Sequence, residues 1–262
     1  MVRRIDSPKF VGQLKYTIMD ITDKEIKYTL HKADSRGRAN HGWLNSKHTF
    51  SFANYYNPER MNFGVLRVLN DDTVAGGMGF GTHPHSDMEI ISIPLEGDLR
   101  HRDSMGTDGI IRSGDIQVMS AGTGISHSEM NGNSDREVKF LQIWIFPREK
   151  GVTPRYDQLT LNPSDREGRL QQVLSPNPND EGVWIHQDAW FHMGKFKLNE
   201  RIEYGLKDVK NGLYVFVISG SLELMGQNLN TRDGIGVTNA KEIELISKAD
   251  NTEVLLMEVP MN

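Results

Sequence analysis

Two histidines and two carboxylates occupy alternate positions in the stretch GTHPHSDMEI, residues 81–90. They are His83, His85, Asp87 and Glu89. Alternate side chains of an extended strand point to the same side, and two imidazoles placed in this way can chelate one metal ion. The spacing alone fits three interpretations: four metal ligands, two ligands with two bystanders, or a polar strand surface without chemistry.

A second stretch, SAGTGISHSEMN (residues 120–131), places His127 and Glu129 at the same spacing. It contains a glycine-rich bend, and glycine lets the backbone pass close to a site because it has no Cβ. If the two stretches meet, three imidazoles and one carboxylate converge. This sulfur-free donor set suits one divalent transition metal, such as Fe, Mn, Ni, Co, Cu or Zn. An octahedral ion would keep two positions open for a substrate and dioxygen, whereas structural zinc sites are closed.

The composition is that of a soluble globular protein, since 37% of the 262 residues are hydrophobic and 25% are charged. The net charge of −5 argues against nucleic-acid binding, and basic residues form no long block. Cysteine is absent, which excludes disulfides and thiolate metal ligands. The N-terminus lacks the continuous apolar run of a signal peptide, and the other apolar runs are too short to span a bilayer, so we expect a cytoplasmic protein without a membrane partner.

Strand-forming sequence dominates the chain. Runs of β-branched and aromatic residues alternate with Gly, Asn and Asp in two series, over residues 63–147 and 182–260. The segment between them, 147–182, is rich in Pro, Asn and charge and is predicted to be a long connection. Two β domains in tandem are the simplest interpretation.

A weak internal repeat with a period of about 120 residues relates the two series. Gly220 corresponds to Gly97, and the turn at Asp233 corresponds to the turn at Asp115. The second copy contains no His-x-His, so we expect the metal chemistry in the first half.

Longer patterns carry a resemblance to a known family. The pattern G-x5-H-x-H-x3-E, from Gly77 to Glu89, resembles the first cupin motif, and G-x2-H-x3-N, from Gly124 to Asn131, resembles the end of the second. Four further segments resemble the pirin family of bicupins, and are most similar to its bacterial quercetin 2,3-dioxygenases: HGWLNSKHTFSFANYY (41–56), FGTHPH (80–85), SAGTGISHSEMN (120–131) and LQIWIFP (141–147).

The resemblance implies an all-β fold of two tandem cupin barrels, which are double-stranded β-helices of the jelly-roll type. It runs from about residue 28 to the C-terminus. We therefore expect residues 1–27 to form an N-terminal extension and residues 28–150 a cupin domain with the metal site. Residues 151–262 would form a linker and a second cupin-like domain without metal ligands.

The resemblance also selects among the candidate ligands. The general cupin pattern uses the glutamate of the first motif, here Glu89, but its spacing to the next glycine is one residue longer than usual, and the second motif lacks its usual proline. Pirins take the fourth ligand from a His-Ser-Glu unit instead. The implied ligands are therefore His83, His85, His127 and Glu129, with iron as the first expected metal.

Three further residues are expected around these ligands rather than on the metal. Besides Glu89 they are His101 and Asp103, from the turn sequence RHRDSMG (residues 100–106). A metal-bound imidazole needs a partner on its second nitrogen, which a nearby carboxylate can supply. A polar turn with no such role is the alternative.

The family implies a dioxygenase that cleaves the heterocycle of a flavonol such as quercetin with O2 and releases carbon monoxide. Glu129 would be both ligand and acceptor of the substrate's hydroxyl proton. The expected partners are a small aromatic substrate and O2, and the expected state is a monomer. The alternatives are an iron-binding, redox-sensing regulator that binds a protein partner, and a metal that only stabilises the fold.

Overall fold

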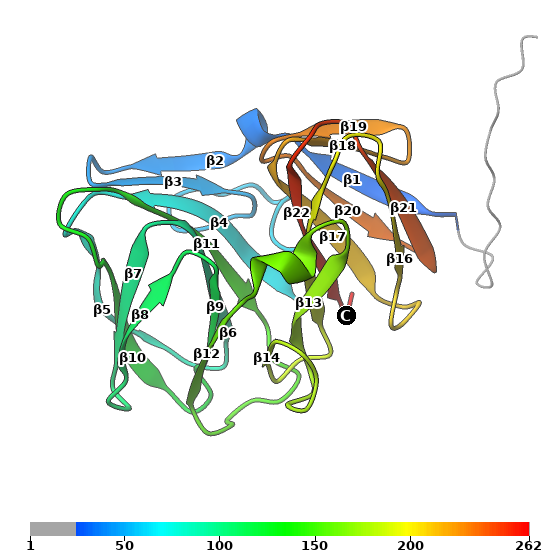
Figure 1. Ribbon diagram of the computed structural model, residues 1–262. Coiled ribbons are helices and arrows are strands. Elements are labelled where there is room, and N and C mark those ends of the chain that lie inside the picture. Colours follow the sequence, from blue (N-terminus) through cyan, green and yellow to red (C-terminus); the bar gives the residue numbers. More distant parts are fainter. Residues whose placement is uncertain (1–24, 262) are drawn as a thin grey trace, which may run out of the picture.

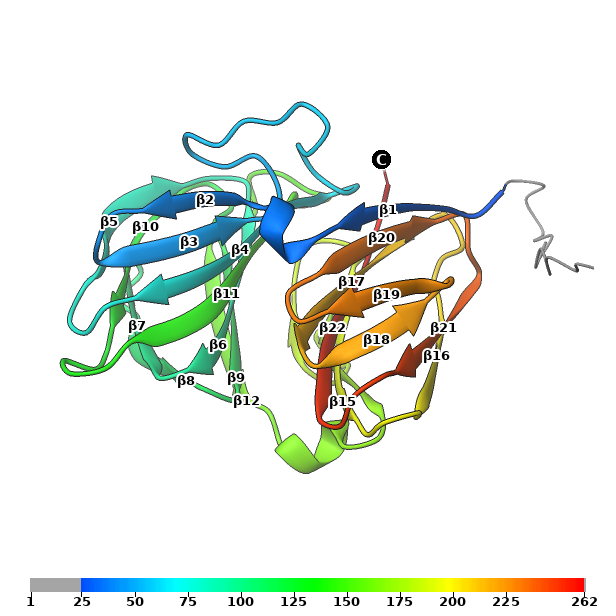
Figure 2. The same cartoon turned by 90° about the horizontal axis from the view of Figure 1, so that it is seen from above.

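The computed structural model describes residues 25–261 and is built almost wholly of β-strands (Figure 1). Within this range it has 22 strands and two short 3-10 helices, η1 (Ala33–Ser35) and η2 (Pro163–Arg166). The strands form two barrels that lie side by side (Figures 1 and 2). Neither helix in that range has the length and apolar character needed to cross a membrane. Most of the expected N-terminal extension lies outside the described residues.

The first barrel consists of two sheets. The larger has seven strands in the order β12-β9-β6-β11-β4-β3-β2, and the smaller has four in the order β5-β10-β7-β8. Their bounds are β2 (Gly37–Asn40), β3 (Leu44–His48), β4 (Leu66–Val74), β5 (Gly79–His85), β6 (Glu89–Glu96), β7 (Asp98–Asp103), β8 (Asp108–Arg112), β9 (Asp115–Ser120), β10 (Ile125–Asn131), β11 (Val138–Ile145) and β12 (Arg155–Thr160).

The second barrel repeats this plan, with sheets β1-β20-β17-β22-β15-β13-β14 and β16-β21-β18-β19. Its strands are β1 (Lys27–His31), β13 (Leu170–Ser175), β14 (Val183–Trp184), β15 (Trp190–Phe196), β16 (Arg201–Gly205), β17 (Gly212–Ser219), β18 (Ser221–Leu224), β19 (Gln227–Asn230), β20 (Gly234–Thr238), β21 (Glu242–Ser247) and β22 (Thr252–Val259). The predicted pair of tandem all-β barrels is confirmed.

Each barrel takes one edge strand from beyond the predicted boundary. β1 pairs with β20 of the second barrel, and β12 pairs with β9 of the first. The boundaries predicted near residues 28 and 150 therefore do not coincide with the sheets, and the predicted connection 147–182 contains two strands, β12 and β13. The sequence of β12, RYDQLT, is polar because an edge strand is half exposed, which explains why its hydrophobic pattern is weak.

A large apolar core joins the two barrels. Alternate residues of β6 and β11, such as Ile91 and Ile143, pack in one buried cluster with Phe191 and Met257 of the second barrel. Because successive strand residues face opposite sides, the intervening residues of β6 and β11 face the interior of the first barrel. The inward face of these strands is where a site can form.

The internal repeat predicted from the sequence is a structural one. Gly97 lies in the turn from β6 to β7 and Gly220 in the turn from β17 to β18, with φ values of 77° and 80°. Glycine is suited to both positions because other residues are strained at positive φ. The two barrels therefore share a frame within which individual positions can be compared.

The glycine bend before β10 allows a test of whether the close backbone approach at Gly122 stabilises the fold. Gly122 has φ 47°, and a Cβ there would lie 1.9 Å from the carbonyl oxygen of Val152. We expect Gly122→Ala to lower the free energy of unfolding by about 1–3 kcal/mol, because the added methyl overpacks the bend. Gly81→Ala is the control, since no heavy atom lies within 4 Å of a Cβ there. Urea denaturation of both metal-free variants measures the effect, and equal stabilities would contradict it.

Candidate metal centre

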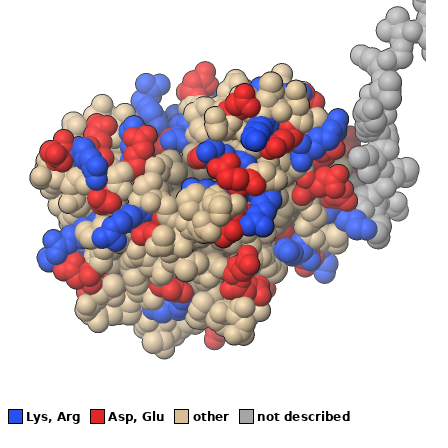
Figure 3. Space-filling model, in the orientation of Figure 1, with Lys and Arg blue, Asp and Glu red and all other residues tan. Residues whose placement is uncertain are grey.

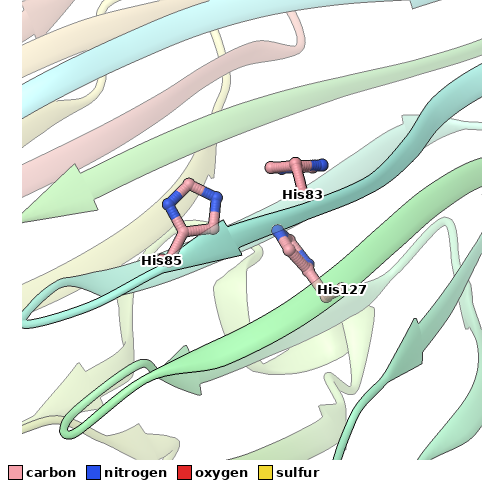
Figure 4. Close-up of side chains that lie close together, drawn as sticks. All are labelled: His83, His85 and His127. Atoms are coloured by element: carbon pink, nitrogen blue, oxygen red, sulfur yellow. The ribbon is translucent and has the colours of Figure 1, made fainter.

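Three imidazoles converge inside the first barrel. His83 and His85 come from β5, and His127 comes from the neighbouring strand β10, where it is paired with His83 (Figure 4). The ring centroid of His127 lies 4.5 Å from that of His83 and 5.0 Å from that of His85. One nitrogen from each ring lies within 4.8 Å of the other two. The predicted meeting of the two histidine stretches is therefore present in the fold.

The nitrogens of these rings are arranged as metal donors. The Nδ1 of His83 donates to the carbonyl oxygen of Gly81 at 2.7 Å, which leaves its Nε2 as a lone-pair donor. Among the residues that the structure describes, both nitrogens of His127 and the Nε2 of His85 are buried without a hydrogen-bond partner. Buried polar atoms are normally satisfied, so the Nε2 of His85 and one of the two His127 nitrogens fit a bound cation. All-nitrogen donors suit a divalent transition metal.

His85 and His127 are also in the protonation state that a metal requires. Burial and the neighbouring His83 lower the pKa of His127 to about 3. Burial and the same neighbour lower the pKa of His85 to about 4. Both rings are therefore neutral at physiological pH, and neutral imidazole is the form that binds metals.

Glu129 lies two residues beyond His127 on β10, with its side chain fully buried. Its carboxylate is hydrogen-bonded from the facing sheet: Ser92 Oγ donates to Oε1 at 3.0 Å, and Gln142 Nε2 donates to Oε2. Burial raises the pKa of Glu129, although both donors and the nearby His101 and His83 oppose that rise. The carboxylate lies outside the group of atoms within 4.8 Å formed by the three imidazoles, so its assignment as a ligand stays a prediction.

A β-bulge lies between the two potential ligands of β10. The pairing of β10 with β5 shifts by one residue between His127 and Glu129. Bulges are frequent next to active sites because they change the direction of a strand locally. The extra residue is on β5, between Phe80 and His83. On β10, His127 and Glu129 therefore keep the shared inward face that their spacing predicts.

His101 and Asp103 lie beside the imidazoles, on β7. This strand pairs with β10 so that His101 is opposite Glu129 and Asp103 is opposite His127. The Nε2 of His101 is 2.9 Å from Asp103 Oδ2, and its ring centroid is 5.3 Å from that of His127. Both side chains are therefore adjacent to the three imidazoles, on the inner side of the small sheet.

Glu89 was predicted to have either a role around the ligands or a structural role, and its contacts lie on the side of β6 that faces away from the barrel interior. It begins β6 on the face that contacts the second barrel, and its Oε2 accepts a hydrogen bond from Ser120 Oγ at 2.7 Å. Burial raises its pKa to about 7. The general cupin spacing places a glutamate here, but the alternation of β6 directs it away from the barrel interior.

The sequence interpretation missed the groups that surround the ligands. Ser92 and Gln142 hold Glu129, and Trp144 stands 4.9 Å from His85 and 5.3 Å from Phe52 between ring centroids. Polar residues inside the apolar runs EIISIPLE and VKFLQIWI were the available signal. Such residues need a partner when they are buried, but their partners are not visible in the sequence.

The site opens to solvent at one end of the barrel. An opening of about 420 Å³ is bordered by His85 and by Pro84, Ser86, Ser104, Gly124, Ile125 and Ser126. Volumes of about 300–1,000 Å³ are typical of small-molecule sites. A small molecule can therefore reach the imidazole cluster from the side of β5, the edge strand.

The lowered pKa of His127 predicts how acid affects the metal-free protein. Between pH 6.5 and about 3 the unfolded chain binds a proton at this residue and the folded chain does not. The free energy of unfolding is therefore not reduced by His127 above pH 6.5, and it decreases as the pH falls below that value, because protons favour the unfolded chain. Between pH 6.5 and 4, His127→Gln should flatten the dependence of the free energy of unfolding on pH by up to about one proton. Urea denaturation at several pH values measures this slope, and an unchanged slope would contradict the assignment.

Known sequences and structures match this chain over both barrels. The Pirin family matches residues 30–145, and the family described as Quercetinase C-terminal cupin domain matches residues 172–259. A protein named quercetin 2,3-dioxygenase from Escherichia coli K12 is 43% identical, over 88% of this chain and 98% of the relative. A pirin-like protein from Caulobacter vibrioides is 40% identical, over 85% of this chain and 96% of the relative.

Among solved structures, the bacterial pirin YhhW from Escherichia coli in complex with nickel(II) is 41% identical, with a TM-score of 0.84. The match covers 89% of this chain and 99% of the YhhW chain. The match includes the barrel that brings the three imidazoles together. The chain therefore belongs to the pirin family.

Proposed function

We propose that this protein is a metal-dependent dioxygenase of the quercetinase type. The observation that carries the proposal is the convergence of His83, His85 and His127 in a barrel open to solvent, where the lowered pKa values of His85 and His127 keep both of these rings neutral. Support comes from the relative named quercetin 2,3-dioxygenase, which is 43% identical over nearly its whole length. The proposed reaction is the cleavage of a flavonol heterocycle by O2 with release of carbon monoxide.

The proposed ligand set is His83, His85, His127 and Glu129, which together carry one negative charge. A divalent ion so bound would keep a net charge of about +1 and would supply a positive position for an enolate oxygen and for O2. Nickel(II) in the related pirin YhhW supports a divalent metal, and iron remains our first expectation. In this proposal Glu129 also takes the hydroxyl proton as the substrate binds.

The mouth of the barrel suits a planar aromatic substrate. Trp144 places its ring beside His85, and Phe52 packs edge to face against Trp144. Aromatic groups pack favourably edge to face or offset. On the face of the molecule in Figure 3, acidic and basic side chains are interspersed and form no large patch of one sign. This surface fits a small-molecule substrate better than a polyanion.

Turnover of quercetin tests the proposed function. We expect the protein loaded with Fe, Ni, Mn or Co to consume quercetin and O2 together and to release carbon monoxide, measured by flavonol absorbance and an oxygen electrode. His83→Ala should lower kcat/KM by more than about 100-fold, because it removes one of three imidazoles. His41→Ala is the control, because it removes an exposed imidazole that does not belong to the cluster of three. No loss of quercetin with any of these metals would refute the proposal.

A matched pair of glutamate variants tests the fourth ligand. Glu129 and Glu89 are both buried carboxylates that accept a hydrogen bond from a serine, but they lie on opposite sides of the sheet that contains β6. We expect Glu129→Gln to lower the bound metal per protein, measured by elemental analysis after dialysis, because an amide is a poorer ligand than a carboxylate. Glu89→Gln should keep the full content. The reverse result would reassign the fourth ligand.

A further inference from the structure

The Glu129 carboxylate is fixed by two side chains from the opposite sheet of the barrel. Ser92 lies on β6 and Gln142 on β11, and the two residues are paired directly across these strands. Each donates to a different oxygen of Glu129. The exposed fractions are 0% for Ser92, 7% for Gln142 and 1% for Glu129. Two donors on two oxygens fix the plane of the carboxylate as well as its position.

The second barrel shows what the same positions contain when no such group is held. Val215 lies five residues before Gly220, as Ser92 lies before Gly97. Val215 is paired with Leu256, as Ser92 is paired with Gln142.

The position of Glu129 follows from the same frame. Leu245 is opposite Leu224, four residues after Gly220, just as Glu129 is opposite His101, four residues after Gly97. Leu245, Val215 and Leu256 are buried in one apolar cluster. The hydrogen-bonded triad of the first barrel is thus replaced by three hydrocarbon side chains in the second.

The replacement extends to the imidazoles. Ile243 lies two residues before Leu245, where His127 lies before Glu129, and Leu224 corresponds to His101. The same fold therefore accepts either polar or apolar side chains at these inward-facing positions. A buried carboxylate without donors would cost several kcal/mol, so Ser92 and Gln142 are what allow the polar side chains.

We propose that Ser92 and Gln142 are positioning residues that hold the Glu129 carboxylate beside the three imidazoles, and that this triad determines the affinity of the first barrel for a divalent cation. The inference rests on the proposed function in taking Glu129 as the fourth ligand. Partners that orient metal ligands typically change metal affinity by about 10–100-fold when they are removed. Neither residue needs to touch the metal or the substrate.

Nickel(II) binding to the full-length protein tests the proposal, because nickel(II) is stable in air. Competition with a chromophoric chelator measures the dissociation constant. We expect Ser92→Ala and Gln142→Leu each to raise it by about 10–100-fold. Ser92→Thr, which keeps the hydroxyl, should restore affinity close to that of the parent.

Gln117→Leu is the matched control. Gln117 is paired with Ser92 on its other side, in β9, and is equally buried. No hydrogen bond joins it to Glu129 within residues 25–261. We expect the Gln117→Leu variant to bind nickel with the affinity of the parent. If removing any buried amide weakened nickel binding, this variant would also bind more weakly.

A triple variant keeps the proposal testable if the single variants fail to fold, because it leaves no member of the triad buried without a partner. Ser92→Val, Glu129→Leu and Gln142→Leu together copy the second barrel and keep all three imidazoles. We expect it to fold, by circular dichroism and thermal melting, and to bind nickel at least 100-fold more weakly than the parent, about the upper limit of such effects.

Two outcomes would overturn the proposal. One is a folded triple variant with the nickel affinity of the parent. The other is single variants that lower the melting temperature of the metal-free protein but leave the dissociation constant unchanged, which would make the pair structural only. Failure of the proposed function is a separate result: the parent would then bind nickel as described yet leave quercetin unchanged.

Discussion

A buried carboxylate inside a β-barrel must be satisfied from across the barrel. The backbone groups of its own sheet are already used in the strand ladders, so Glu129 depends on side chains of the facing sheet. Ser92 and Gln142 meet this requirement, and they belong to a row of polar residues that crosses five strands of the large sheet: His48, Asn70, Gln142, Ser92 and Gln117. The site therefore depends on both sheets being closed in one register.

Apolar residues pack beyond this polar level towards both ends of the barrel, although the buried pair of Ser46 and Asp72 lies next to the level on one side. Towards one end of the barrel pack Leu44, Val74 and Phe140, and towards the other pack Ile90 and Met119. Such layers keep water from the carboxylate and strengthen its electrostatic interactions. His83 and His85 lie on the edge strand β5 and are only partly buried, whereas His127 is almost fully buried. The imidazole cluster is thus buried at His127 and reachable from the side of His85 and β5.

The two barrels show how one frame supports two roles. The first uses its inward positions for imidazoles, a carboxylate and their hydrogen-bond partners. The second fills the corresponding positions with Leu, Ile and Val, which stabilise without partners because they bury only apolar surface. A shared apolar core joins the barrels, so the second barrel supports the sheet that supplies Ser92 and Gln142.

The sequence by itself determined much of this protein. Strand periodicity gave the all-β class, the repeat at Gly97 and Gly220 gave two related barrels, and the alternate spacing of His83 and His85 gave their shared face. These features are local, so they can be read over a few residues. Edge strand β12 was missed because a half-exposed strand has a weak hydrophobic pattern.

Only the tertiary structure decided which polar residues meet. Ser92 and Glu129 are 37 residues apart, and no periodicity relates them. It also decided that Glu89 faces the second barrel although it shares the spacing of the ligands, because β6 belongs to the other sheet from β5 and presents its odd-numbered residues to the interface. Long-range pairing of strands sets which face of each strand lines the site, and one sequence motif does not contain that information.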